Sequence, residues 1–165
     1  MRTEKPMKNE IPKRRRAARI ALWILIGITV IFILTRSMSG QSASQSESQR
    51  ITDLIRAILG TEKISDAFVR KLAHFAEFFA LGAELSASLW LAGRRTPQAY
   101  GNVWFAGVLV ALCDETVQIF SHRGSQVQDV WLDIAGATCG ILLLFGIRAI
   151  AGTVRRKQGN GENAP

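Results

Sequence analysis

The sequence is poor in cysteine and histidine, with two of each among 165 residues. Cys113 and Cys139 both lie in apolar stretches, and their spacing matches neither a metal site nor a redox pair. We expect both to be small apolar packing residues. The chain also lacks a nucleophile elbow, a P-loop and an H-E-x-x-H motif, so no common catalytic signature indicates its chemistry. No internal repeat is visible, and the absence of a collagen period or a coiled-coil heptad excludes those fibrous classes.

Acidic residues are fewer than basic ones, since 13 Asp and Glu stand against 21 Lys and Arg, for a net charge of +8. Charged residues make up 21% of the chain and hydrophobic residues 48%. That much apolar material excludes a disordered protein. The charged and apolar residues are segregated along the chain, which disfavours a compact soluble enzyme. The net charge alone would be compatible with a nucleic-acid-binding protein, so the positions of the charges along the chain must show whether they serve that purpose.

Four apolar stretches are each long enough to cross a membrane as a helix, because about 30 Å of hydrocarbon requires roughly 20 residues. They are residues 17–35, 75–92, 101–120 and 130–152. A soluble helical bundle is the alternative, but its helices would need polar faces that the first and last stretches lack. The predicted fold class is therefore all-α, a polytopic membrane protein with four transmembrane helices.

The first stretch follows a run of basic residues, an arrangement that also begins signal peptides. Its apolar run is long for such a peptide and no clear cleavage site follows, so we expect an uncleaved anchor. The predicted organisation begins with a basic cytoplasmic N-terminus at 1–16 and a first transmembrane helix at 17–35. An extracytoplasmic segment at 36–70, a core with three transmembrane helices at 71–152 and a cytoplasmic tail at 153–165 follow.

Lysine and arginine are distributed unevenly between the two sides that four alternating spans define. The N-terminal segment, the connection at 93–100 and the C-terminal end together carry 14 of them, and the other side carries seven over a longer total length. Because cytoplasmic loops are enriched in Lys and Arg, both termini are predicted to be cytoplasmic. Topology and anionic lipid then account for the basic excess, and no nucleic-acid partner is expected.

The extracytoplasmic segment 36–70 divides into two parts. Residues 37–49 are rich in Ser and Gln and predict a flexible tether. Apolar residues with helical spacing follow at Ile51, Leu54, Ile55 and Ile58. They predict a short amphipathic helix that docks on the bundle or lies on the membrane surface, with Gly60 at its C-terminal stop. The charged tail after Val154 is expected to be disordered.

Polar side chains share one face in each of the last three apolar stretches, judged at about 3.6 residues per helical turn. The faces comprise His74, Glu77, Glu84 and Ser88 in the second stretch, Gly107, Ala111, Asp114 and Gln118 in the third, and Asp129, Asp133, Gly136 and Gly140 in the fourth. The G-x-x-x-G pair in the fourth stretch allows close helix approach. Small residues beside carboxylates indicate that these faces pack on each other and away from lipid.

The predicted topology places these polar residues at one depth, at the extracytoplasmic ends of three helices, with only Glu84 deeper. The loop before the last span adds Arg123, and Lys71 lies one turn before His74. Ionisable residues inside a membrane are costly, so they default to a functional-site hypothesis. The candidate binding residues are Lys71, His74, Glu77, Asp114, Glu115, Gln118, Arg123, Asp129 and Asp133.

This cluster carries two basic and five acidic side chains, a net charge of −3 with histidine neutral. A partly dehydrated site cannot keep that charge uncompensated, so some carboxyl groups protonate, His74 carries a proton, or a cation binds. A ligand-binding or catalytic site, a structural salt-bridge network and an ion path are the alternatives. The candidate catalytic residues, suited to general acid–base chemistry, are His74, Glu77, Asp114 and Glu115. No cofactor is predicted; carboxylates with histidine suit a divalent metal, although their spacing matches no specific metal motif.

The same residues resemble the VanZ-like family, whose pattern is roughly K-x-x-H-F-x-E-Y/F, D-E-x-x-Q, R-x-x-x-x-x-D and D-x-x-G. Matching segments begin at Lys71, Asp114, Arg123 and Asp133, and the resemblance extends over residues 71–147. Phe78 stands where the family commonly has tyrosine. The resemblance implies a bacterial multi-pass inner-membrane protein, and the founding member of the family is associated with low-level resistance to the glycopeptide teicoplanin.

Residues and resemblance together predict a cell-envelope membrane protein that binds or modulates an envelope lipid or amphiphile through the outer-facing acidic and histidine cluster. Its partners would be the lipid membrane and a lipid or amphiphilic ligand on the outer side. An intramembrane hydrolase or transferase acting on an envelope lipid is the first alternative, and a purely structural membrane partner is the second. Whether the chain is an enzyme, and whether drug resistance applies to it, stays open on the sequence alone.

Overall fold

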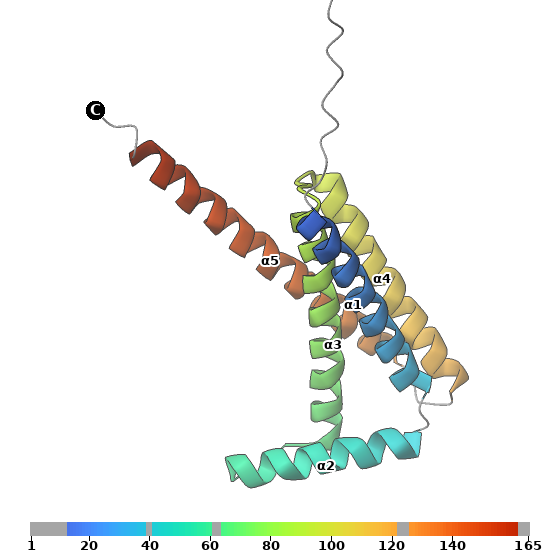
Figure 1. Ribbon diagram of the computed structural model, residues 1–165. Coiled ribbons are helices and arrows are strands. Elements are labelled where there is room, and N and C mark those ends of the chain that lie inside the picture. Colours follow the sequence, from blue (N-terminus) through green and yellow to red (C-terminus); the bar gives the residue numbers. More distant parts are fainter. Residues whose placement is uncertain (1–12, 39–40, 61–63, 122–125, 162–165) are drawn as a thin grey trace, which may run out of the picture.

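The computed structural model describes residues 13–38, 41–60, 64–121 and 126–161, and these residues form helices without any β-strand (Figure 1). The helices are α1 (Lys13–Met38), α2 (Gln41–Leu59), α3 (Asp66–Leu91), α4 (Pro97–Phe120) and α5 (Val127–Gly161). The all-α prediction is therefore confirmed for the part of the chain that the structure describes.

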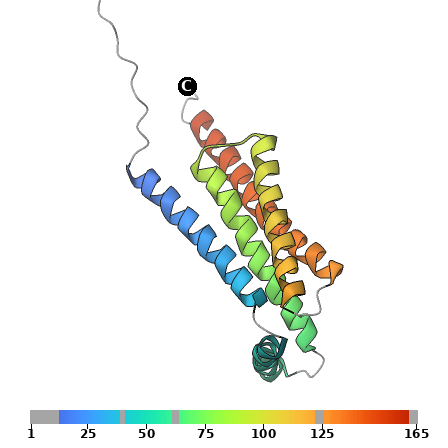
Figure 2. The same ribbon diagram turned by 90° about the vertical axis from the view of Figure 1, so that its right-hand side faces the viewer.

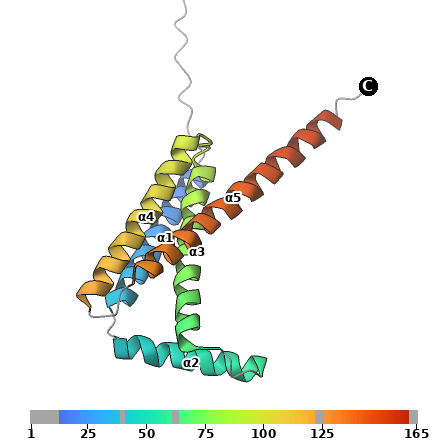
Figure 3. The ribbon, with the colours of Figure 1, turned by 180° about the vertical axis from the view of Figure 1, so that it is seen from behind.

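Four of the helices form a bundle, and α2 runs crosswise at one end of it (Figure 1). α1 and α4 run toward this end, which we call the α2 end, whereas α3 and α5 run away from it. α3 lies between α1 and α5 in Figure 2 and contacts every other helix. Seen from behind in Figure 3, α5 crosses α3 and then extends away from the bundle. The alternation places the C-terminal end of α4 and the N-terminal ends of α3 and α5 together at the α2 end.

Local sequence signals explain where the helices begin and end. Ser65 and Thr96 are N-caps whose side chains each accept a hydrogen bond, from Phe68 N and Ala99 N respectively, both at 3.2 Å. Such caps satisfy backbone donors that the first helical turn leaves free. Gly60 follows α2 with a φ of 62°, a conformation that favours glycine, so its predicted role as a helix stop is confirmed.

Glycines allow α3 and α5 to pack with their backbones in close contact. A Cβ at Gly82 would meet the carbonyl oxygen of Ala137, and one at Gly140 would meet the carbonyl oxygen of Phe79. At Gly136 the added atom would lie 2.6 Å from the carbonyl oxygen of Phe75. The predicted G-x-x-x-G contact is thus present, and it sets how α5 lies against α3.

Large apolar side chains cover the outside of the bundle, including exposed tryptophan, isoleucine, leucine and phenylalanine residues of α1, α4 and α5. Three helical segments are long and apolar enough to cross a membrane, namely Lys13–Met38, Pro97–Phe120 and Val127–Thr153. Apolar helices that expose apolar side chains are suited to lipid, so these features indicate a membrane protein. α3 is not among the three because His74, Glu77 and Glu84 lower its mean hydropathy.

Three local expectations were wrong. Residues 41–49 of the Ser/Gln-rich segment form the first half of α2 rather than a tether, because serine and glutamine are tolerated in a helix that continues into an amphipathic half. The tail expected to be disordered after Val154 instead continues α5 as far as Gly161. Cys113 and Cys139 are free and exposed on the bundle surface, so they do not fill the core.

Replacing Gly140 by alanine should destabilise the protein, because the new methyl group collides with the backbone of α3. Overpacking of this kind typically costs about 1–3 kcal/mol. Gly146→Ala is the matched control, since it lies on the same helix and an added Cβ meets nothing within 4 Å. Thermal unfolding of the purified proteins in detergent measures both, and equal unfolding temperatures for the two variants would contradict the close α3–α5 contact.

Candidate functional site

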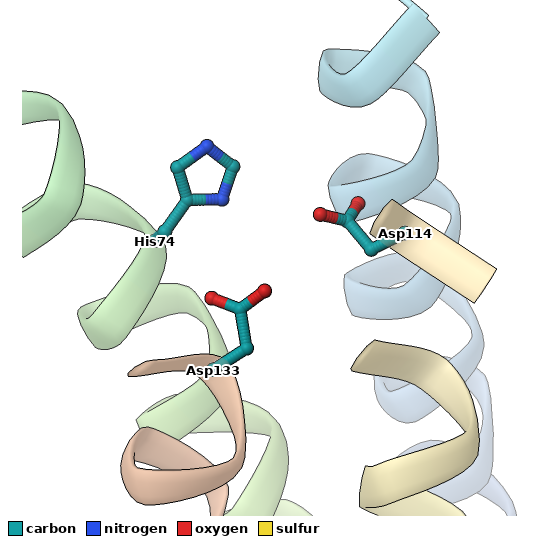
Figure 4. A group of neighbouring side chains, drawn as sticks. All are labelled: His74, Asp114 and Asp133. Atoms are coloured by element: carbon teal, nitrogen blue, oxygen red, sulfur yellow. The ribbon is translucent and has the colours of Figure 1, made fainter. Parts of the chain in front are cut away.

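Three ionisable side chains from three helices meet inside the bundle near the α2 end. His74 comes from α3, Asp114 from α4 and Asp133 from α5, and one ligand atom of each lies within 4.8 Å of the others. Figure 4 shows the imidazole ring and the two carboxylates turned toward a common space. Asp114 is 0% exposed and Asp133 is 1% exposed. We call these three residues the His–Asp cluster.

Helix faces position the carboxylates as the sequence indicated. The face of α4 that carries Asp114 also carries Gly107, Ala111 and Gln118, and all four residues are buried. On α5, Asp133 lies one turn before Gly136, where the backbone of α5 contacts α3. The close helix contact therefore places Asp133 beside the face of α3 that carries His74.

Asp114 accepts hydrogen bonds at both of its carboxylate oxygens. The Ser37 hydroxyl donates to Oδ1, and Gln118 Nε2 donates to Oδ2 at 2.7 Å. Ser37 is fully buried at the C-terminal end of α1, so α1 takes part in the site. Two donors from different helices hold the Asp114 carboxylate in one orientation.

Ion pairs neutralise two of the acidic residues around the His–Asp cluster. Arg36 Nη1 lies 2.7 Å from Glu77 Oε1, and Lys71 Nζ lies 3.2 Å from Asp129 Oδ1. The sequence had suggested Arg123 as a cation for this region, but Arg123 lies outside the described residues. Arg36 and Ser37 were missed because the sequence placed both in the extracytoplasmic segment that begins at residue 36, whereas in the structure they belong to the last turn of α1. Their position directly after a predicted span was the signal that could have revealed them.

Asp133 and Glu115 are the acidic residues of the site whose carboxyl oxygens have no hydrogen-bond partner among the described residues. Both oxygens of each carboxylate are buried. With Glu77 and Asp129 in ion pairs, the buried acidic residues without a described cationic partner are Asp114, Glu115 and Asp133. The interior thus offers acceptors without enough donors, which suits a cation or a ligand rich in N–H or O–H groups.

Glu84 is separate from the His–Asp cluster. Its Oε1 accepts a hydrogen bond from Thr29 Oγ1 at 2.9 Å, deeper along the contact between α1 and α3. The sequence had also placed Glu84 deeper than the other acidic residues. Its own donor and its distance along α3 make it a useful comparison for substitutions in the cluster.

A second polar feature lies at the end of the bundle opposite α2. A hollow of about 250 Å³ is lined by residues that include Arg95, Tyr100, Phe145 and Arg148. Arg148 Nη1 donates to the carbonyl oxygen of Arg94 at 2.7 Å, and Tyr100 packs edge-on against Phe145. The hollow and the His–Asp cluster therefore lie at opposite ends of the bundle, and none of the described residues that line the hollow is acidic.

Substituting Ser37 by alanine should lower the stability of the bundle, because Asp114 then loses a buried donor. Loss of one partner of a buried hydrogen bond costs about 1–3 kcal/mol. Ser88→Ala is the control, since the hydrogen bond that the Ser88 hydroxyl donates among the described residues goes to the Leu85 carbonyl oxygen of its own helix, at 2.7 Å. Thermal unfolding in detergent should show a clearly larger loss for Ser37→Ala, and similar losses would mean that the Ser37–Asp114 contact contributes little.

A family model described as VanZ/LLP1 matches residues 21–149. The match begins in α1, ends in α5 and includes every candidate binding residue. No curated protein and no solved structure matches the chain. Since the matched region covers well over half of the sequence and the whole site, the chain belongs to the VanZ/LLP1 family.

Proposed function

We propose that this protein crosses the bacterial inner membrane four times, with α3 as the fourth span. At about 1.5 Å per residue, the 26 residues of α3 extend over about 39 Å, which exceeds the hydrocarbon thickness. Its acidic side chains turn into the bundle, where Glu77 pairs with Arg36 and Glu84 binds Thr29. Leu72 and Trp90 are exposed for contact with lipid. Paired and inward-facing charges are compatible with a span.

Both termini are proposed to be cytoplasmic, which makes the α2 end extracytoplasmic. The N-terminal end of α1 and the C-terminal end of α5 both lie away from α2 (Figure 1). That side carries 14 of the 21 lysine and arginine residues. The positive-inside rule supports this orientation, and it puts the His–Asp cluster near the outer surface.

α2 is proposed to lie in the outer membrane–water interface. Ile51, Leu54 and Ile58 are exposed, whereas Thr52 is buried. The Arg56 guanidinium donates to the Ile64 carbonyl oxygen through Nε at 3.0 Å and Nη2 at 2.6 Å, which ties α2 to the start of α3. An amphipathic helix held across the end of a bundle, with an open apolar row, suits the boundary between head groups and acyl chains.

The proposed function is to bind or modulate an envelope lipid or amphiphile at the His–Asp cluster. The observation that carries it is the set of buried carboxylates on Asp114, Glu115 and Asp133, which lack described cationic partners. A head group with amine or hydroxyl donors would satisfy these acceptors. Its acyl chain would lie along the apolar surface of the bundle. The site would thus bind the head group through the buried carboxylates and the acyl chain through the apolar outer surface.

An intramembrane hydrolase or transferase is the alternative that one specific observation favours. The His74 ring lies within reach of two carboxylates, an arrangement that permits general acid–base catalysis on a bound lipid. A purely structural role would use the same contacts to hold the helix ends together. Variants that keep the fold but change the envelope phenotype distinguish a ligand-binding or catalytic role from a purely structural one.

Reporter fusions should place the connection after α4 outside the cell. Alkaline phosphatase fused after Ser121 is expected to be active. The same enzyme fused after Gly93 or at the C-terminus should be inactive, whereas a green fluorescent protein fused at these two positions should fluoresce. The charge bias of the loops is the physical reason. Phosphatase activity after Gly93, or its absence after Ser121, would overturn the outward-facing site.

Asp114→Asn should abolish the effect of the protein on the envelope while leaving its amount in the membrane unchanged. The charge that attracts a donor-rich head group is removed, but the side chain keeps its shape. Lipid profiles and teicoplanin susceptibility of cells with the wild type, the variant and no protein provide the measurement. Asp114→Asn cells should match cells without the protein in both assays.

Glu84→Gln is the matched control for this experiment, because Glu84 lies on the same bundle but outside the His–Asp cluster. It should behave as the wild type does. Loss of the Asp114→Asn protein from the membrane would favour the structural role. A variant present at normal level with a wild-type lipid profile and wild-type susceptibility would contradict ligand binding.

A further inference from the structure

We propose that His74, Asp114 and Asp133 bind one divalent transition-metal ion of the Zn²⁺ or Mn²⁺ type. Each residue offers one ligand atom, and these atoms lie within 4.8 Å of one another. Ligand atoms around an ion with bond lengths of about 2.0–2.2 Å are about 3–4 Å apart. The three ligand atoms are therefore already close to the separations that a metal ion requires.

The buried Asp133 carboxylate is the independent observation that points to a bound cation. It is 1% exposed, neither oxygen has a hydrogen-bond partner among the described residues, and Figure 4 shows it directed into the space between His74 and Asp114. A buried carboxylate without donors is strongly unfavourable. A divalent ion between Asp133 and Asp114 would remove both the desolvation cost and the repulsion between the two charges.

The surroundings prepare Asp114 to act as a metal ligand. Ser37 and Gln118 hold its carboxylate in place, as outer hydrogen bonds commonly do for ligating carboxylates. A carboxylate has about four acceptor positions, so two hydrogen bonds leave room for a metal. Glu77 and Asp129 already pair with Arg36 and Lys71, which directs an incoming cation to the His–Asp cluster.

The donor set determines the class of metal. One imidazole with two carboxylates suits Zn²⁺ or Mn²⁺, whereas Ca²⁺ and Mg²⁺ prefer all-oxygen sites. Three protein ligands also leave a coordination position for water or for a head-group oxygen, as in catalytic rather than structural zinc sites. The inference deepens the proposed function and rests on the same residues, yet metal binding depends neither on orientation nor on a lipid.

The test uses the full-length protein without an affinity tag, purified in detergent, stripped with EDTA and then incubated with Zn²⁺, Mn²⁺ or Ca²⁺. Bound metal is measured by mass spectrometry after desalting, and the unfolding temperature is recorded with and without metal. We expect about one equivalent of Zn²⁺ or Mn²⁺ per chain together with a metal-dependent rise in unfolding temperature, since a ligand of the native state stabilises it. Retention of Ca²⁺ alone, or of no metal, would overturn the proposal.

Asp133→Asn separates a metal ligand from a structural residue. Without metal this variant should unfold at the same or a higher temperature than the wild type, because a buried unpaired charge is gone. With metal it should bind at least tenfold more weakly and lose the rise in unfolding temperature. A purely structural Asp133 would instead leave metal retention equal in the variant and the wild type, which contradicts the proposal.

Two further variants complete the comparison. Ser37→Ala, which removes a donor to Asp114 but no ligand, should weaken metal binding by about 10–100-fold. Glu84→Gln should bind metal as the wild type does. Equal weakening in Glu84→Gln and Asp133→Asn would place the metal elsewhere. If the wild-type protein binds metal but Asp114→Asn cells keep a wild-type lipid profile, this inference is retained and the proposed binding of an amphiphile is rejected.

Discussion

Carboxylates buried among apolar helices impose the requirement that organises this bundle. Asp114 and Asp133 are almost wholly buried, and a carboxylate removed from water needs donors, a cation or a proton to compensate it. α1 meets part of this requirement through Arg36 and Ser37, so the first helix belongs to the site as well as anchoring the chain. The charge that stays uncompensated is the reason to consider a metal ion or a donor-rich head group at the α2 end.

Fold and site depend on the same small residues. Gly82, Gly136 and Gly140 let α5 cross α3 with their backbones in contact, and that crossing places Asp133 beside His74. In lipid, apolar burial gives little preference for one helix pairing over another, so close backbone packing and polar pairs carry much of the specificity. A shift of α5 along α3 would therefore change the fold and separate the ligating atoms at once.

Helix faces and loop charges predicted the core of the site, because a helical period and a charge bias can be recognised within short segments. His74, Asp114 and Asp133 were expected at one depth, and the structure brings them together. Ser37 was missed because its composition placed it in the predicted tether at 37–49, whereas in the structure it belongs to the last turn of α1. The helix over the Ser/Gln-rich segment was missed because composition alone does not show that α2 continues through it.

Local properties of the chain are sufficient to establish an all-helical membrane protein of the VanZ/LLP1 family with acidic residues gathered at one end. These local properties do not reveal which of the acidic residues has hydrogen-bond donors around its carboxylate. Ser37 and Asp114 are 77 positions apart, and their contact exists only because α1 and α4 end side by side. Helix packing therefore distinguishes the two aspartates. Asp114 accepts hydrogen bonds from two donors, whereas Asp133 has none among the described residues. The difference appears only in the tertiary structure because the position of each donor is set by several helices together.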